Sequence, residues 1–282
     1  MRIQNYITGI QGVTAGGVAT LSIPIDRRYH ALKLFVSGTF NSATSTDPTE
    51  LIASARLIVN GVVMRDLLPS DIIKIAKLNG ITPDTTNGET PFYFSEPWRA
   101  SVLGEESTSW DMKGQTSFNL EVTFNSVSVT GSYAITNLAA AVVGSFDYAR
   151  NLNGANQPFL AIVKQLRYAV SAPSGQFDFT TLPTVNPIQR VHFRTSTGSI
   201  TSMEVYNDST KVMEGLAAQI NDFYKDYKLV PANGFTLSAV FDFTQQISDA
   251  LLVQNNNLDF RITSSAANAL TAIVEARAPG YV

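Results

Sequence analysis

The sequence contains no cysteine, and it is poor in charge. Without cysteine there are no disulfides, no thiolate zinc sites, no iron–sulfur clusters and no cysteine nucleophiles. A secreted scaffold of this size more often carries disulfides, so we expect the chain to fold in a reducing cytosol. Charged residues make up 15% of the 282 residues, against roughly 25% in an ordinary soluble domain. The composition is therefore not that of a typical cytosolic enzyme.

The sequence also lacks a strong charge of either sign and a targeting segment. The formal net charge is −3, and the longest basic run is Arg27-Arg28, which leaves no electrostatic footprint for nucleic acid. The N-terminus has no apolar core or cleavage site of a signal peptide. Residues 122–146 are uncharged over a length that would span a bilayer, but polar residues such as Ser126 and Asn137 interrupt them. We predict neither direct nucleic-acid binding nor a membrane-spanning segment.

Motifs for catalysis and metal binding are absent from the sequence. The only histidines, His30 and His192, lie outside any HExxH-type spacing, and we interpret both as structural or surface residues. No G-x-S-x-G elbow and no P-loop occurs. Glu105-Glu106 and the acidic group at 221–226 lack the spacing of an EF-hand, so solvated faces are favoured and calcium at a subunit contact stays an open alternative. We predict no catalytic, cofactor-binding or metal site, and no cofactor.

The residues that are present favour β-structure. Ser, Thr and Asn are abundant, and they favour turns and strands over helix interiors. Alternating apolar positions at 18–25 and 32–36 predict strands with one buried face. Asn60-Gly61 separates two β-branched runs and predicts a tight hairpin, because both residues tolerate positive φ. Helical spacing at 67–78 and at 211–224 predicts two short helices.

The two predicted helices occur in similar surroundings, which indicates an internal duplication. Ala55–Gly61 before the first helix matches Ser202–Asp208 before the second. Downstream, residues 116–122 match residues 256–262. A repeat of half the chain is far longer than the roughly 20 to 50 residues of a solenoid repeat, so we expect two copies of one β-domain.

The number of strands in each half indicates the fold. Each half holds about seven or eight strand candidates and one inserted helix, as expected for a jelly roll of two four-stranded sheets. We predict an all-β double jelly roll, with two similar eight-stranded β-sandwiches that each carry a short inserted helix. The expected parts are an N-terminal arm at 1–16, a first jelly roll at 17–150, a linker at 151–170 and a second jelly roll at 171–282. The arm shows no period that places it in either sheet, so we expect its order to come from outside its own subunit. The alternative is that Ile3, Ile7 and Ile10 pack on their own sandwich as an extra edge strand.

An aromatic cluster at Phe92, Tyr93, Phe94 and Trp98 allows two interpretations. A carbohydrate-binding platform would expose such rings, whereas a sandwich core would bury alternate ones. Strand periodicity places Phe92 and Phe94 on one face and Tyr93 on the other, so core filling is favoured. The segment 241–243 repeats this alternation in the second half.

Short matches in a fixed order along the chain resemble a known family. They are Met1-Arg2, Val13–Gly17, Ser22–Ile25, Leu34–Gly38, Lys164–Leu166, Leu182-Pro183 and Ala272–Glu275. Together with the duplication and the total length, they resemble the double jelly-roll major capsid proteins of tailless icosahedral bacteriophages with an internal membrane. The corticovirus type is the most similar, and the tectivirus and nontailed marine vibriophage types are more distant.

The resemblance implies a structural protein and not an enzyme. It implies a major capsid protein that is synthesised in the host cytoplasm and forms pseudo-hexameric homotrimeric capsomers of an icosahedral virion shell over an internal membrane. Its partners would be neighbouring capsomers and minor capsid, vertex or inner membrane proteins. Two alternatives stay open: a glycan-binding spike or lectin-like β-sandwich, and, less favoured, a β-sandwich glycoside hydrolase, whose paired carboxylates cannot be recognised in a sequence.

Overall fold

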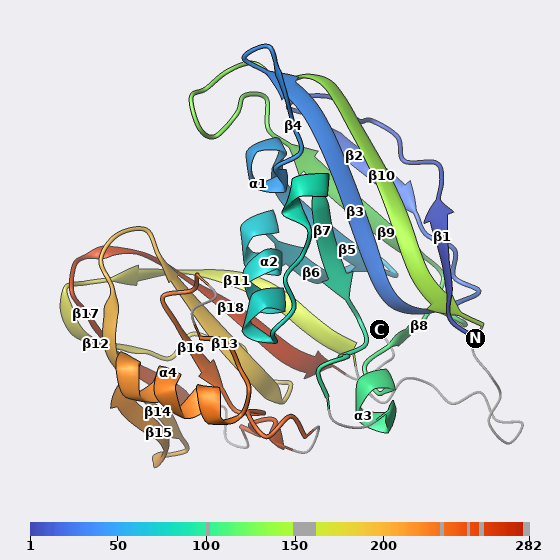
Figure 1. Cartoon of the computed structure of the whole chain (residues 1–282). Coiled ribbons are helices and arrows are strands. Elements are labelled where there is room, and N and C mark those ends of the chain that lie inside the picture. The colour runs from blue at the N-terminus through green and yellow to red at the C-terminus, as the bar shows by residue number, and fades with distance from the viewer. Residues whose placement is uncertain (100–101, 149–161, 232–233, 247–248, 254–256, 279–282) are drawn as a thin grey trace, which may run out of the picture. The chain divides into compact units, whose positions relative to one another are not determined.

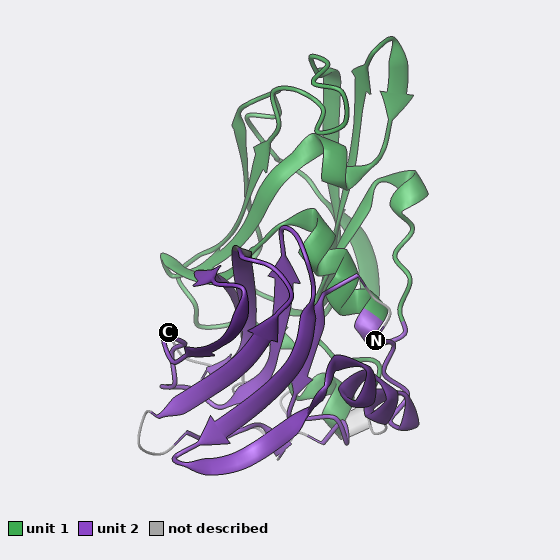
Figure 2. Cartoon of the chain, turned by 90° about the vertical axis from the view of Figure 1, so that its left-hand side faces the viewer, with its two compact units in different colours: residues 1–77, 81–162, 279–282 green, residues 78–80, 163–278 purple. Residues whose placement is uncertain are grey.

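The computed structural model describes residues 1–99, 102–148, 162–231, 234–246, 249–253 and 257–278. These form two compact units, the first from the described residues of 1–77 and 81–162, and the second from those of 78–80 and 163–278 (Figure 2). Strands dominate both units and the helices are short (Figure 1). This is the all-β class that the sequence predicts.

The first unit is a sandwich of two antiparallel sheets. Its strands are β1 (Ile3–Ile7), β2 (Val18–Ser22), β3 (Arg28–Phe40), β4 (Ala43–Ser45), β5 (Ile52–Val59), β6 (Val62–Leu67), β7 (Glu89–Tyr93), β8 (Trp110–Asp111), β9 (Phe118–Phe124) and β10 (Thr136–Asp147). One sheet has the order β1-β10-β3-β7, with the short strands β4 and β8 also paired to β3. The other sheet has the order β2-β9-β5-β6.

The second unit repeats this arrangement. Its strands are β11 (Ile162–Ala172), β12 (Gly175–Phe179), β13 (Ile188–Thr195), β14 (Ile200–Asn207), β15 (Thr210–Leu216), β16 (Leu237–Val240), β17 (Leu258–Ser264) and β18 (Asn268–Ala278). The sheet orders are β11-β18-β13-β16 and β12-β17-β14-β15. Taken in chain order, these strands occupy the same places as β1, β2, β3, β5, β6, β7, β9 and β10. Each unit is therefore a jelly roll, and the predicted double jelly roll is confirmed.

One short helix follows the same strand in both jelly rolls. The helices are α1 (Pro48–Leu51), α2 (Pro69–Leu78), the 3-10 turn η1 (Thr85–Asn87), α3 (Val102–Glu106) and α4 (Ala217–Asp226). α2 follows β6 and α4 follows β15, and the fourth residue of each helix, Ile72 or Ile220, is buried. No helix in the described part of the chain has the length and apolar character needed to cross a membrane.

The prediction of a helix over 211–224 is wrong in its first half. Residues up to Leu216 belong to β15, which pairs with β14 from Asn207↔Thr210 to Ser202↔Leu216, and the helix begins at Ala217. The physical reason is the hairpin with β14, which provides hydrogen-bond partners for the backbone N–H and C=O groups of this segment. This pairing outweighs a local spacing of apolar residues that also suits a helix.

The N-terminal segment belongs to the first jelly roll. β1 pairs with β10 from Ile3↔Phe146 to Ile7↔Val142, so the expectation of an arm outside both sheets is wrong for these residues. The strand has no alternation because Ile7 is its only buried residue. Residues 162–170 of the expected linker lie in β11, and residues 151–161 lie outside the described residues. The other expected boundaries, at residues 17 and 150, stay predictions.

The turn between β5 and β6 and the pairing register of the strands test two details of the sequence analysis. Asn60 and Gly61 have φ of 51° and 80°, which confirms the predicted hairpin between β5 and β6. Leu57 faces Leu120 in the first unit, and Val205 faces Phe260 in the second. Leu57 therefore corresponds to Val205, one residue away from the match made by sequence.

Aromatic rings fill the core of the first unit. Phe94 stacks on Trp110 with ring centroids 4.3 Å apart, and Tyr29 contacts Phe118 edge to face at 5.6 Å. Phe92 and Phe94 are each 1% exposed, while Tyr93 is only partly buried. The interpretation of Phe92 and Phe94 as core filling is confirmed.

Candidate functional site

A buried ion pair lies in the second unit. Arg190 of β13 reaches Asp242, which follows β16, through Nε to Oδ1 at 2.7 Å and Nη2 to Oδ2 at 3.3 Å. Its Nη1 donates to the side-chain oxygen of Asn79 at 2.8 Å. Arg190 is 2% exposed and Asp242 is 0% exposed. Two charges that are taken out of water in this way are tolerated only with close geometry and further hydrogen bonds, which this group has.

A second buried group lies beside the first. His192 Nε2 is 2.5 Å from Glu275 Oε1, and His192 Nδ1 is 2.9 Å from Ser238 Oγ. Gln165 donates to the other carboxylate oxygen of Glu275 at 2.9 Å. Burial raises the pKa of Glu275, but the hydrogen bond and charge of His192, with the charge of Arg190, outweigh burial and hold that pKa at about 2. Glu275 therefore stays ionised inside the sheet.

Ser238, His192 and Glu275 have the order of a nucleophile, a base and an orienting carboxylate. Such a triad works only where a substrate reaches the hydroxyl. Ser238 is 5% exposed, His192 is 0% exposed, and the ring of Phe235 stacks on His192 at 4.7 Å. All three side chains are buried, so the interpretation of His192 as a structural residue stays the favoured prediction.

The first unit carries a related group at the same place. Arg28 holds Asp147 through two bonds of 2.9 and 2.7 Å, and His30 Nε2 lies 3.1 Å from Asp147. Burial raises the pKa of Asp147, but the hydrogen bonds from Arg28 and His30 outweigh burial and lower it. Burial also lowers the pKa of His30, against the opposing hydrogen bond to Asp147.

The two groups are repeats of one pattern. In β3 the residues Arg28 and His30 are spaced as Arg190 and His192 are in β13. Arg28 faces Asp147 of β10, and Arg190 faces Glu275 of β18. Sequence reasoning missed this pattern, although the only two histidines of the chain, each two residues after an arginine, were a usable signal.

Acidic residues considered for calcium have basic partners in the structure. Glu105 and Glu106 lie 2.7 and 3.3 Å from Arg2, and Glu106 also lies 3.4 Å from Arg28. Asp222 lies 3.2 Å from Lys225. Across the described ranges, no group of three or more His, Cys, Asp or Glu side chains gathers in a way that could hold a metal ion.

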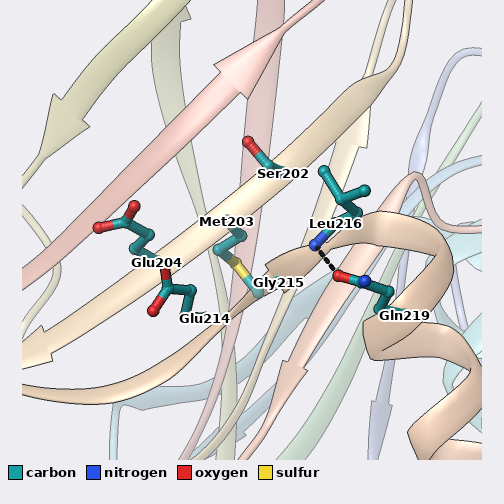
Figure 3. A pocket seen from close by; sticks show the side chains of 7 residues that line it. All are labelled: Ser202, Met203, Glu204, Glu214, Gly215, Leu216 and Gln219. Atoms are coloured by element: carbon teal, nitrogen blue, oxygen red, sulfur yellow. Dashed lines mark hydrogen bonds between the residues drawn. The ribbon is translucent and has the colours of Figure 1, made fainter.

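A groove opens on the surface of the second unit where β14, β15 and α4 meet (Figure 3). Its volume is about 450 Å³. Leu216 at its rim is 56% exposed, and the Leu216 N–H donates to Gln219 Oε1 at 3.1 Å. The lining residues are Ser202, Met203, Glu204, Glu214, Gly215, Leu216 and Gln219.

A row of charged residues crosses the outer face of the same sheet. Asp178, Arg261 and Glu204 occupy facing positions on β12, β17 and β14. Arg261 Nε lies 2.9 Å from Asp178, and Lys211 lies 3.3 Å from Glu204 and 2.9 Å from Glu214. Exposed pairs of this kind add little to stability, because water solvates each charge with or without its partner.

These features define a class of protein. The described residues form two jelly rolls in one chain, with polar groups that are locked inside the sheets and an exposed groove at a sheet edge. This is the double jelly-roll fold of capsid subunits. Sequence profiles give the family: the viral coat protein P2 N-terminal domain matches residues 4–141, and the viral coat protein P2 C-terminal domain matches residues 162–279. The chain belongs to the viral coat protein P2 family.

Solved structures have the same fold. The major capsid protein P2 from bacteriophage PM2 matches with a TM-score of 0.82 at 15% identity, over 99% of this chain and 98% of that chain. The STIV MCP matches with a TM-score of 0.71 at 9% identity, over 100% and 98%. The Faustovirus major capsid protein matches with a TM-score of 0.68 at 8% identity, over 99% and 90%. No curated protein matches the chain in sequence.

Family membership gives the general function. The protein is a viral coat protein of the P2 family, a structural component of the virion and not an enzyme. A capsid protein assembles with copies of itself into a shell. The resemblance noted in the sequence is thereby confirmed at the level of the family.

Proposed function

We propose that three copies of this chain form a pseudo-hexameric capsomer, and that these capsomers build an icosahedral shell over an internal membrane. The observation that carries the proposal is the duplication of one jelly roll, strand for strand, within the chain. Three such chains supply six similar sandwiches, and a cyclic arrangement of three chains then approximates a hexagon.

Burial of complementary surfaces between copies drives this assembly. Charged residues are only 15% of the chain, and the cores of protein interfaces are depleted of Lys, Glu and Asp. Within the shell, neighbouring capsomers are the main partners. Minor capsid, vertex or inner membrane proteins complete the set of partners that we propose.

Light scattering of the purified chain tests the trimer. We expect a mass of about three times 30.6 kDa at micromolar concentration. A monomer or a two-fold dimer across that range would contradict the proposal. Electron microscopy of assembled particles tests the shell and the membrane, because the proposal requires hexagonal capsomers outside a continuous bilayer density.

A further inference from the structure

Each jelly roll has a flank formed by the last strands of its two sheets. In the first unit β1 and β2 end their sheets, and we call this pair the first flank. In the second unit β15 and β16 end their sheets, and α4 joins them. We call β15, β16 and α4 the second flank. The two flanks contain different strands of the jelly roll.

In each flank, the outer edge of one strand already has hydrogen-bond partners within its own chain. On β16, the hydroxyl of Tyr224 donates to the Ser238 carbonyl at 3.1 Å and accepts from the Val240 N–H at 2.9 Å. On β2, Gln11 and Thr20 exchange two backbone hydrogen bonds of 2.9 Å. Unpaired strand edges attract other strands, and these contacts remove that tendency from β16 and β2.

The other strand in each flank stays open. Within the described residues, β1 pairs only with β10, and β15 pairs only with β14. Exposed large hydrophobic residues mark the same places. The exposed large hydrophobic residues in the described strands are Tyr6 on β1, Val18 on β2, Val212 and Leu216 on β15, and Val62 at the start of β6. All except Val62 lie on a flank. Open edges beside exposed apolar side chains indicate interaction surfaces.

A charged lysine or a β-bulge often prevents a strand from pairing at a sheet edge. Both occur on β15, but neither blocks its second half. Lys211 points to Glu204 and Glu214 on its own sheet, so its charge is already engaged. A bulge interrupts the pairing with β14 near Val212, but the register is regular from Met213 to Leu216. This regular half of β15 borders the groove. Phe223 of α4, in the same flank, is 45% exposed. On β1, only the Tyr6 N–H is occupied by a side chain, the neighbouring Asn5.

We propose that β15 and its groove on one copy of the chain receive the first flank, β1 and β2, of a second copy. The occupant is a second copy because the family assembles with itself. The contact joins two different surfaces, so it is heterologous, and repetition around a three-fold axis closes it into a ring. A contact of β15 with β15 would instead give a two-fold dimer. The inference rests on the proposed trimer and names the contact that closes it.

Engineered cysteines test the contact, because the chain has no cysteine of its own. Gln4→Cys on β1 is combined with Glu214→Cys on β15, both at exposed positions, and a short bismaleimide is added to the purified protein. The matched control combines Gln4→Cys with Gln176→Cys, an exposed position on β12. We expect covalent dimers and trimers with the first pair, and none with the control or with either single variant.

The outcomes separate this inference from the proposed trimer. One contrary result is a trimer by light scattering in which the first cysteine pair fails to cross-link, and another is a trimer in which that pair cross-links no better than the control pair. Either result overturns the inference and leaves the proposed trimer intact. Cross-linking of Glu214→Cys alone shows a two-fold contact and also overturns it. A protein that stays monomeric overturns both.

A point substitution supplies a second readout. Leu216→Asp places a charge in the open half of the second flank and should weaken the trimer at least about tenfold, as interface hot spots do. Val185→Asp lies in a loop of the same unit at 87% exposure and should leave the dissociation constant unchanged. Circular dichroism confirms that both variants fold. Equal dissociation constants for the two variants would overturn the inference.

Discussion

Two arginine–aspartate pairs in the second jelly roll have similar geometry and opposite environments. Arg190–Asp242 is buried, whereas Arg261 and Asp178 are 36% and 50% exposed in their side chains. Burial decides what each pair contributes, because a buried charge that loses its partner has no water to compensate it. An exposed charge is solvated with or without its partner.

This difference predicts unequal effects of one substitution. Asp242→Asn should lower the free energy of unfolding by about 3–5 kcal/mol, because it leaves Arg190 charged and buried. Asp178→Asn is the matched control and should cost less than about 1 kcal/mol. Urea denaturation measures both values. Similar losses for the two variants would show that burial does not govern these pairs.

Glu275 predicts how stability depends on pH. Its pKa is held at about 2 against an ordinary value of 4.5, so the folded state keeps the carboxylate ionised where the unfolded chain takes up a proton. The stabilisation is fully present above pH 4.5 and is lost as the pH falls towards 2. Glu275→Gln should therefore flatten the fall in melting temperature across this window. Asp26→Asn, at a side chain that is 63% exposed, should retain the wild-type slope.

At the scale of elements, β1 supports the sheet on which it lies. It contributes the ladder to β10 and the buried side chain of Ile7, and the preceding Arg2 binds Glu105 and Glu106. Its removal exposes the edge of β10 and leaves two acidic residues without this partner.

Deletion of residues 2–10 should therefore destabilise the protein. We expect the melting temperature to fall by about 5–10 °C, which corresponds to a few kcal/mol for a chain of this size. Gln4→Ala, at an exposed position of β1, is the control and should melt like the wild type. Differential scanning calorimetry makes the comparison. An unchanged melting temperature in the truncated chain would restore the view of this segment as an independent arm.

The sequence predicts elements well where one face is clearly buried. The helix at 67–78 and the turn at Asn60-Gly61 depend on spacing and turn chemistry within a few residues, and both are present. β1 is only the less favoured alternative in the sequence, because a single buried residue makes no period. β15 was misassigned because Met213 and Ile220 are spaced as in a helix although a strand ends between them.

The buried polar groups were beyond prediction for a different reason. His30 and Asp147 are 117 residues apart in the chain, and His192 and Glu275 are 83 residues apart. Such partners meet only through strand pairing, which a single sequence does not specify to the residue. A slip of one residue, as in the match of Leu57 to Glu204, turns an inward position into an outward one.

At the scale of the whole molecule, duplication gives the chain two similar folds with different surfaces. The first flank exposes Tyr6 and Val18, and the second exposes Leu216 beside the groove. The two flanks are built from different strands of the jelly roll, so a contact between them has a direction. Such a contact places one copy against the next in a single orientation, as the proposed ring requires.

The single hydroxyl of Tyr224 also has a consequence for folding inside the cell. The hydroxyl bonds both the Ser238 carbonyl and the Val240 N–H on β16, and it reaches them only once α4 has docked. A shell needs many copies of its subunit, so newly made chains meet at high local concentration. Until Tyr224 arrives, β16 is a template on which strands of other chains can add and aggregate. The docking of α4 therefore takes this strand edge out of reach of other chains.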